Sequence, residues 1–196
     1  MNFPILSSLI LLPIIGSLFL LLSKDKNSNT GKYVALFTSF VNFLISIYLW
    51  YQFDPTTSDF QFVEDREWLK GFINYKVGID GISILFIVLT SLITPLCIIS
   101  VNNTVKDRLR DFLIAILVME SLMIGVFCSL DLVIFYLFFE AGLIPMFLII
   151  GIWGGARRVY SAFKFFLYTL LGSVLMLIAI ISIYWISGTT DITQLY

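Results

Sequence analysis

Residues 112–153 read FLIAILVMESLMIGVFC, SLD and LVIFYLFFEAGLIPMFLIIGIW, so that two apolar runs are joined only by the turn at 129–131. Each run is long enough to cross about 30 Å of hydrocarbon as a helix. Because the turn is so short, the two helices are expected to be antiparallel neighbours. Glu120 and Glu140 lie near the middle of the two runs. At about 1.5 Å of rise per residue, both carboxylates are therefore expected at a matching depth near the midplane of a bilayer.

A glutamate at this depth calls for an explanation, because an ionisable side chain in the membrane centre costs at least a few kcal/mol on insertion scales. The functional interpretation is a proton or ion pathway. The alternative is a protonated glutamate that donates a hydrogen bond to a backbone carbonyl. Two carboxylates at one depth favour the pathway, so we predict that Glu120 and Glu140 take part in it.

The composition indicates a membrane protein. The 196 residues are 59% hydrophobic and 13% charged, contain no histidine and have a mean hydropathy of +0.98. This charge content is about half that of a soluble domain. We therefore predict an all-α, polytopic membrane helix bundle with about six transmembrane helices. The expected spans are 3–22, 33–52, 79–101, 112–128, 132–153 and 161–187.

Basic residues indicate how the bundle is oriented. Most of them fall in the first, third and fifth loops: Lys24, Lys26, Lys32, Lys106, Arg108, Arg110, Arg157, Arg158 and Lys164. These loops alternate onto one side, and the positive-inside rule places that side in the cytoplasm and both termini outside it. The first span has no positive charge before it and no small-residue cleavage site after it. It is therefore expected to remain as a helix rather than be cleaved as a signal peptide.

The long polar segment at 53–77 is expected on the outer side. Its aromatic residues Trp68, Phe72 and Tyr75 recur at helical spacing. This spacing is compatible with a short interfacial helix, and a loop packed over the bundle is an equally good interpretation.

Lys164, near the start of the sixth run, is the third ionisable candidate. Its long side chain can snorkel to the inner surface, or it can act as a cation on Glu140. Asp80 and Asp131 lie at the ends of predicted helices and are expected to be caps or interfacial residues. Cys97 and Cys128 fall toward opposite ends of their spans, too far apart for a disulfide.

Motifs for redox chemistry are missing from the sequence. There is no CxxC pair, no histidine, no Walker loop and no GxGxxG after a strand. We therefore expect no cofactor in this chain and assign any redox step to a partner.

Two stretches carry a family resemblance: YKVGIDGISILFIVLTSLITPLCI at 75–98 and FYLFFEAGLIPMFLIIGIWGGARRVYSAFKFFLYTLLGSVLMLIAI at 135–180. They resemble the antiporter-like membrane subunit M of NADH:quinone oxidoreductase (respiratory complex I), which is called subunit 4 in mitochondria. The resemblance covers almost the whole chain. It implies the N-terminal part of a fold of about fourteen helices built around inverted repeats.

The resemblance also implies roles and partners. Glu140, which precedes the L-I-P-M string, corresponds to the family's proton-channel carboxylate. NADH, FMN, iron–sulfur clusters and quinone are expected in partner subunits. The implied partners are other membrane subunits and the lipid bilayer, without nucleic acid. We expect the bacterial cytoplasmic (inner) membrane in preference to the mitochondrial inner membrane.

Residues 1–111, with an outer loop at 53–77, are expected to form an N-terminal part of three helices. Residues 112–196 then hold the first three helices of an incomplete proton-translocating repeat. The chain is expected to be a fragment, a split-gene product or a truncated record. Two other functions stay open: a subunit of a multisubunit cation/proton antiporter, and an inactive structural remnant.

Overall fold

Six long helices make up most of the computed structural model, which describes residues 4–22, 29–69, 73–101, 105 and 107–195. They are α1 (Ile5–Leu22), α2 (Asn29–Gln52), α3 (Ser83–Ser100), α4 (Leu109–Cys128), α5 (Leu132–Trp153) and α6 (Arg158–Ser187). All six are long and apolar enough to cross a membrane. The predicted helical membrane bundle is confirmed, and the helix ends lie within four residues of the predicted spans.

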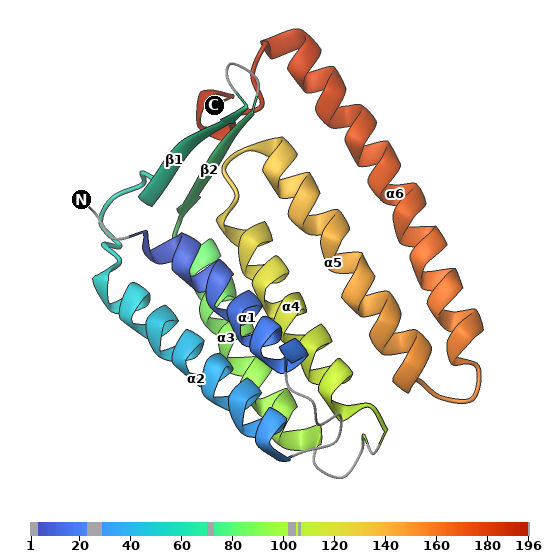
Figure 1. Ribbon diagram of the computed structural model, residues 1–196. Helices are drawn as coiled ribbons and strands as arrows, with labels where there is room; N and C mark the ends of the chain where they lie inside the picture. Colours follow the sequence, from blue (N-terminus) through green and yellow to red (C-terminus); the bar gives the residue numbers. More distant parts are fainter. Residues whose placement is uncertain (1–3, 23–28, 70–72, 102–104, 106, 196) are drawn as a thin grey trace.

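Helices α1 and α4 lie side by side at the centre of the bundle (Figure 1). Helices α2 and α3 pack together on one side of this pair, α5 packs against α4, and α6 packs against α5. One cluster of buried residues, which includes Leu9 and Ile124, lies at the end of the bundle that holds the strands. A second cluster, which includes Leu20 and Leu117, lies toward the other end.

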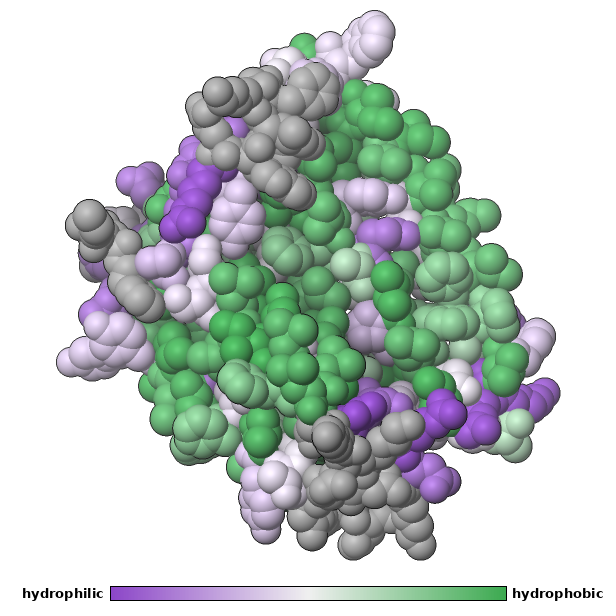
Figure 2. Space-filling model, viewed as in Figure 1, coloured by the Kyte–Doolittle hydropathy of each residue, from purple (hydrophilic) through white to green (hydrophobic). Residues whose placement is uncertain are grey.

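The outer faces of the bundle are apolar. Helix α6 buries only Ala162, Ser173 and Ile180. Figure 2 shows hydrophobic residues over the middle of the molecule and hydrophilic residues gathered toward its two ends. This banding is the one that a bilayer requires of a spanning bundle.

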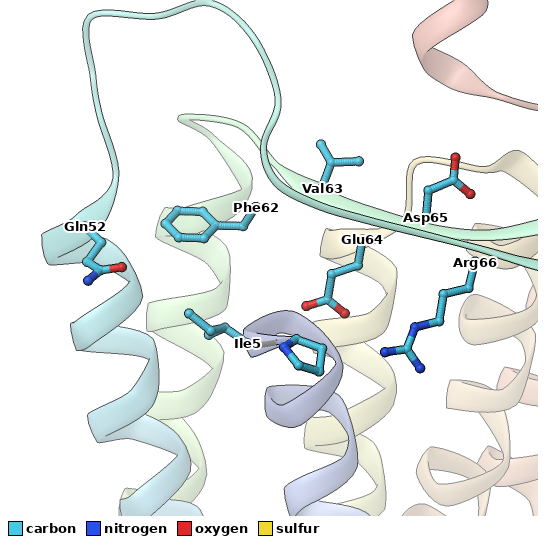
Figure 3. A pocket seen from close by; sticks show the side chains of 8 residues that line it. Ile5, Gln52, Phe62, Val63, Glu64, Asp65 and Arg66 are labelled. Atoms are coloured by element: carbon cyan, nitrogen blue, oxygen red, sulfur yellow. The ribbon is translucent and has the colours of Figure 1, made fainter. Parts of the chain in front are cut away.

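The segment between α2 and α3 forms a β-hairpin, so the interpretation of 53–77 as an interfacial helix is wrong. Strand β1 (Gln61–Leu69) pairs antiparallel with β2 (Ile73–Ile79), with Asp65 opposite Lys76. Side chains of a strand alternate between two faces. Glu64 and Arg66 accordingly point toward the helices, whereas Asp65 points away (Figure 3). Phe72, part of the helical-spacing argument, lies outside the described residues.

The hairpin caps the first helix. The Glu64 carboxylate accepts hydrogen bonds from the backbone N–H of Leu6 at 2.9 Å and of Ser7 at 3.3 Å, and from the Ser7 hydroxyl. The first N–H groups of a helix have no partner within the helix and carry a partial positive charge. Glu64 therefore supplies a cap for α1 from a distant strand.

A second set of contacts joins the hairpin to the α4–α5 turn and the end of the chain. We call Lys76, Leu130, Asp131, Thr190 and Asp191 the hairpin clasp. The Leu130 N–H donates to the Lys76 carbonyl at 3.0 Å. The Lys76 ammonium lies 2.6 Å from the Asp191 carboxylate, and the Thr190 hydroxyl donates to Asp131 at 2.5 Å. The clasp thus holds the turn from which α4 and α5 both extend.

Charge and hydrogen bonding stabilise the ionised form of Asp191. Burial alone would raise the pKa of this carboxyl. The hydrogen bonds from Lys76 and Thr193, together with the charge of Lys76, outweigh burial and hold the pKa below its usual value.

Several smaller predictions are confirmed. Asp131 caps α5 by accepting from the N–H groups of Val133 and Ile134. Asp80 accepts from the Ser83 N–H at 2.7 Å where α3 begins. Cys97 and Cys128 are both free thiols.

Candidate functional site

Glu120 lies in the interior of the bundle. It is 2% exposed on α4, and one of its carboxylate oxygens, Oε1, accepts a hydrogen bond from the Asn42 amide of α2 at 2.9 Å. The other oxygen, Oε2, is buried and has no hydrogen-bond partner among the described residues; the same holds for the Asn42 amide oxygen. A buried polar atom without a partner costs free energy, so these two oxygens mark a place for a proton or a water molecule.

A hollow of about 210 Å³ lies next to Glu120, between α3 and α4. Its lining includes Thr90, Thr94 and Cys97 of α3 and Met119 of α4. A water molecule takes about 30 Å³ of liquid volume and needs two or more polar partners. The hollow is large enough to hold water beside the carboxylate.

Glu140 lies on α5, as far from the turn between α4 and α5 as Glu120 does. It is eight residues from the start of its helix, as Glu120 is eight residues from the end of α4, so both lie about 12 Å from the turn that joins them. Glu140 is half-buried, and its Oε2 atom is buried without a hydrogen-bond partner among the described residues. Within the residues that the structure describes, no hydrogen bond links Glu120 to Glu140. The structure thus places two separate carboxylates at one level.

Close packing of α4 against α5 sets this arrangement. Gly125 of α4 lies against the ring of Phe138, where an added Cβ atom would approach ring carbons to 2.6–2.8 Å. Only a residue without a Cβ leaves room for the ring at this spacing. Further along α5, the buried Pro145 lacks the N–H that would bond to the carbonyl of Ala141, next to Glu140.

Lys164 is not brought to Glu140. It is exposed on α6, with its ammonium 6.0 Å from the centre of the Tyr160 ring. Six residues from the start of α6, it lies about 9 Å from that end of the bundle, whereas Glu140 is about 20 Å from the same end of α5. Among the described residues no ion pair joins Lys164 to a carboxylate.

Asn42 is the functional candidate that sequence reasoning missed. It is fully buried and is the hydrogen-bond donor to Glu120. The sequence does show Asn42 as a polar amide within the apolar run FVNFLIS at 40–46, which could have marked it as a candidate. The sequence could not show which helix its side chain faces.

Comparison with known proteins gives sequence relatives over nearly the whole chain. Residues 129–196 match the family described as NADH:quinone oxidoreductase/Mrp antiporter, TM. NADH-quinone oxidoreductase subunit M of Rhodobacter capsulatus is 59% identical over 87% of the chain and 32% of that relative. NADH-ubiquinone oxidoreductase chain 4 of Arabidopsis thaliana is 48% identical over 95% of the chain and 38% of that relative. Subunit M of Rickettsia prowazekii is 46% identical over 100% of the chain and 40% of that relative.

Solved structures share the fold. Respiratory complex I from Thermus thermophilus with bound NADH contains a chain with a TM-score of 0.80 and 30% identity, over 97% of this chain and 38% of that one. The membrane-bound sulfane sulfur reductase, an archaeal respiratory complex, matches at a TM-score of 0.77 and 20% identity, which shows a common fold alone. The chain spans 32%, 38% and 40% of the length of the three sequence relatives named above. Sequence and fold together show that this chain is similar, over 87–100% of its own length, to part of the length of membrane subunits named NADH-quinone oxidoreductase subunit M and NADH-ubiquinone oxidoreductase chain 4.

Proposed function

We propose that this chain works in the membrane arm of a proton-pumping NADH:quinone oxidoreductase, as a subunit or as part of one, and that Glu140 is its proton-binding site. One observation carries the proposal: a carboxylate oxygen of Glu140 is buried, has no hydrogen-bond partner within the described ranges, and lies near the middle of a candidate membrane span. Glu140 also lies within residues 129–196, which match the oxidoreductase and antiporter family. An intramembrane ionisable residue of this kind is the usual mark of a proton relay.

In this mechanism Glu140 binds a proton and releases it when a cation approaches its carboxylate. Quinone reduction in other subunits drives that change. Glu120 is an auxiliary carboxylate that holds a second proton or orders water in the adjacent hollow, and Asn42 positions it. Lys164 is the third ionisable group of the proposed site, and its exposure favours snorkelling toward the membrane surface.

The redox chemistry is assigned to other subunits. They would hold NADH, FMN, iron–sulfur clusters and quinone, while this chain contributes proton translocation. Its partners would be the other membrane subunits and the lipid bilayer. We propose the bacterial cytoplasmic membrane as its location. We also keep the division into residues 1–111 and 112–196 as a proposal, with the second part supplying three helices of a translocating repeat.

The test is Glu140→Gln in the assembled oxidoreductase, with Glu140→Asp as the matched variant that keeps a carboxylate. NADH-driven acidification of membrane vesicles should fall to a small fraction of the wild-type value in Glu140→Gln. Glu140→Asp should retain most of it. Electron transfer from NADH to a soluble acceptor reports assembly and should be unchanged in both. Full pumping by the Gln variant would contradict the assignment.

The alternative is a cation/proton antiporter subunit, because the matched family includes Mrp antiporters. Purification of the chain from its native membrane distinguishes the two functions. Co-purification of flavin and iron–sulfur proteins supports the oxidoreductase. Co-purification of small membrane proteins alone supports the antiporter.

A further inference from the structure

An apolar groove of about 510 Å³ runs between α1 and α5 on the side where the hairpin lies. Leu11 and Ile14 line it from α1, and Leu137 and Phe138 line it from α5. Arg66 and Tyr75 of the hairpin also belong to its lining. We call this hollow the α1–α5 groove. Its size and its mainly apolar walls with a few polar groups are typical of a ligand site.

Polarity changes along the length of the groove. Its lining on α1 runs from Ser7, in the first turn of the helix, to Ile14, about 10 Å further along the axis. Arg66, Tyr75 and Ser7 place polar groups at the hairpin end, which lies at the membrane surface. The rest of the groove descends into the depth of the hydrocarbon. A matching ligand has an anionic head and an apolar tail.

Arg66 supplies the charge at the polar end. Across the described ranges its guanidinium forms no ion pair. Glu64 points to the same side of β1 (Figure 3), but its carboxylate is already bonded to the first turn of α1. A guanidinium binds phosphate oxygens in a two-pronged geometry that lysine does not match. Arg66 is therefore placed to take an anion from outside the chain.

The Tyr75 hydroxyl adds a neutral polar group near this charge. It lies 3.2 Å from the Ser7 hydroxyl. Burial, more than any other cause, raises the pKa of Tyr75, so the phenol keeps its proton at neutral pH. It does not add a negative charge that would repel an anionic ligand.

We propose that the α1–α5 groove binds a membrane phospholipid, with the phosphodiester on Arg66 and one acyl chain between α1 and α5. The groove opens sideways to the bilayer, since Leu11 is 52% exposed and Leu137 is 44% exposed. A phospholipid is the amphiphile that surrounds membrane-spanning helices, and its phosphate would lie near their ends, where the hairpin is. The inference does not depend on the proposed proton site.

Native mass spectrometry of the purified 196-residue chain in neutral detergent tests the proposal, with phosphatidylglycerol as the probe. Arg66→Gln should weaken binding about tenfold, because a charge-assisted hydrogen-bond pair is lost. Leu11→Trp should weaken it similarly by filling the groove. Leu18→Trp is the matched control, because Leu18 is equally exposed on α1, at 52%, and does not line the groove.

Three results would overturn the proposal. The first is unchanged affinity in Arg66→Gln, and the second is unchanged affinity in Leu11→Trp. The third is an equal loss in Leu18→Trp, which would mean that any bulky residue on α1 disturbs a nonspecific lipid shell. Dioleoylglycerol, which has the tails but no phosphate, should bind at least tenfold more weakly than phosphatidylglycerol if Arg66 holds the head group. Circular dichroism verifies that each variant keeps its helices.

Discussion

The contact between Gly125 of α4 and Phe138 of α5 offers a sharp test of the packing that sets the level of the two glutamates. In Gly125→Ala the new methyl group would lie 2.6–2.8 Å from three carbons of the Phe138 ring, one of them the carbon at its base. The ring cannot simply swing its far end away, so the helices must separate. Overpacking of this kind costs about 1–3 kcal/mol. The better helix propensity of alanine offsets about 1 kcal/mol.

The expected net effect is a loss of about 0–2 kcal/mol in the free energy of unfolding. It can be measured by SDS titration of the full chain in mixed micelles, followed by circular dichroism. Gly142→Ala is the matched control, because Gly142 lies on α5 and an added Cβ there meets nothing within 4 Å. That variant should be unchanged or more stable by up to about 1 kcal/mol.

A double-mutant cycle isolates the steric part of the effect. In a Phe138→Ala background the ring is gone, so Gly125→Ala should become neutral or stabilising. A coupling energy of about 1–3 kcal/mol between positions 125 and 138 is expected. If Gly125→Ala is more stable than wild type by about 1 kcal/mol, as Gly142→Ala can be, or if the two positions show no coupling, Gly125 is not needed for the close approach of α4 and α5.

Four other predictions concern the hairpin and the orientation. Lys76→Met should lower the free energy of unfolding by about 1.5–3 kcal/mol, because Asp191 loses a charged hydrogen bond. The pKa of Asp191 is lower in the folded chain than the ordinary value of 3.8. Ionised Asp191 therefore stabilises the folded chain above pH 3.8, and this stabilisation is lost as the pH falls through the pKa of the folded chain. A pH series of unfolding midpoints should show the loss in wild type and not in Asp191→Asn. Glu64→Gln should lower the free energy of unfolding by about 1 kcal/mol, because it weakens the cap of α1. Asp65 is exposed, so Asp65→Asn should change this free energy by less than about 0.5 kcal/mol. In membrane vesicles of known sidedness, a cysteine at position 157 should react with impermeant reagents from the cytoplasmic side and one at position 65 from the other side; the reverse would contradict the orientation.

Features that depend on local sequence were predictable. The six spans follow from runs of apolar residues, because hydrocarbon admits only helices that satisfy their own backbone hydrogen bonds. The common depth of Glu120 and Glu140 follows from helical rise and the short turn at 129–131. The capping role of Asp131 also follows, since its hydrogen-bond partners are two and three residues away.

The hairpin was not predictable in the same way. Aromatic residues at helical spacing masked a strand pattern in which Glu64 and Arg66 alternate with Asp65. A strand has no backbone partner of its own, so its formation depends on what pairs with it and what it covers. Here β1 gains β2 as its partner and the start of α1 as the group it caps.

The polar partners of the site were likewise decided only by tertiary structure. Composition and periodicity determine that this chain lies in a membrane as helices and that two carboxylates share one level. The bond from Asn42 to Glu120 spans 78 residues, and the ion pair from Lys76 to Asp191 spans 115. Helical periodicity says which residues share a face but not which other helix that face meets, because the angles and distances between helices arise from packing. For that reason the glutamates could be found in the sequence, whereas the amide that holds Glu120 and the clasp that holds the turn required the folded chain.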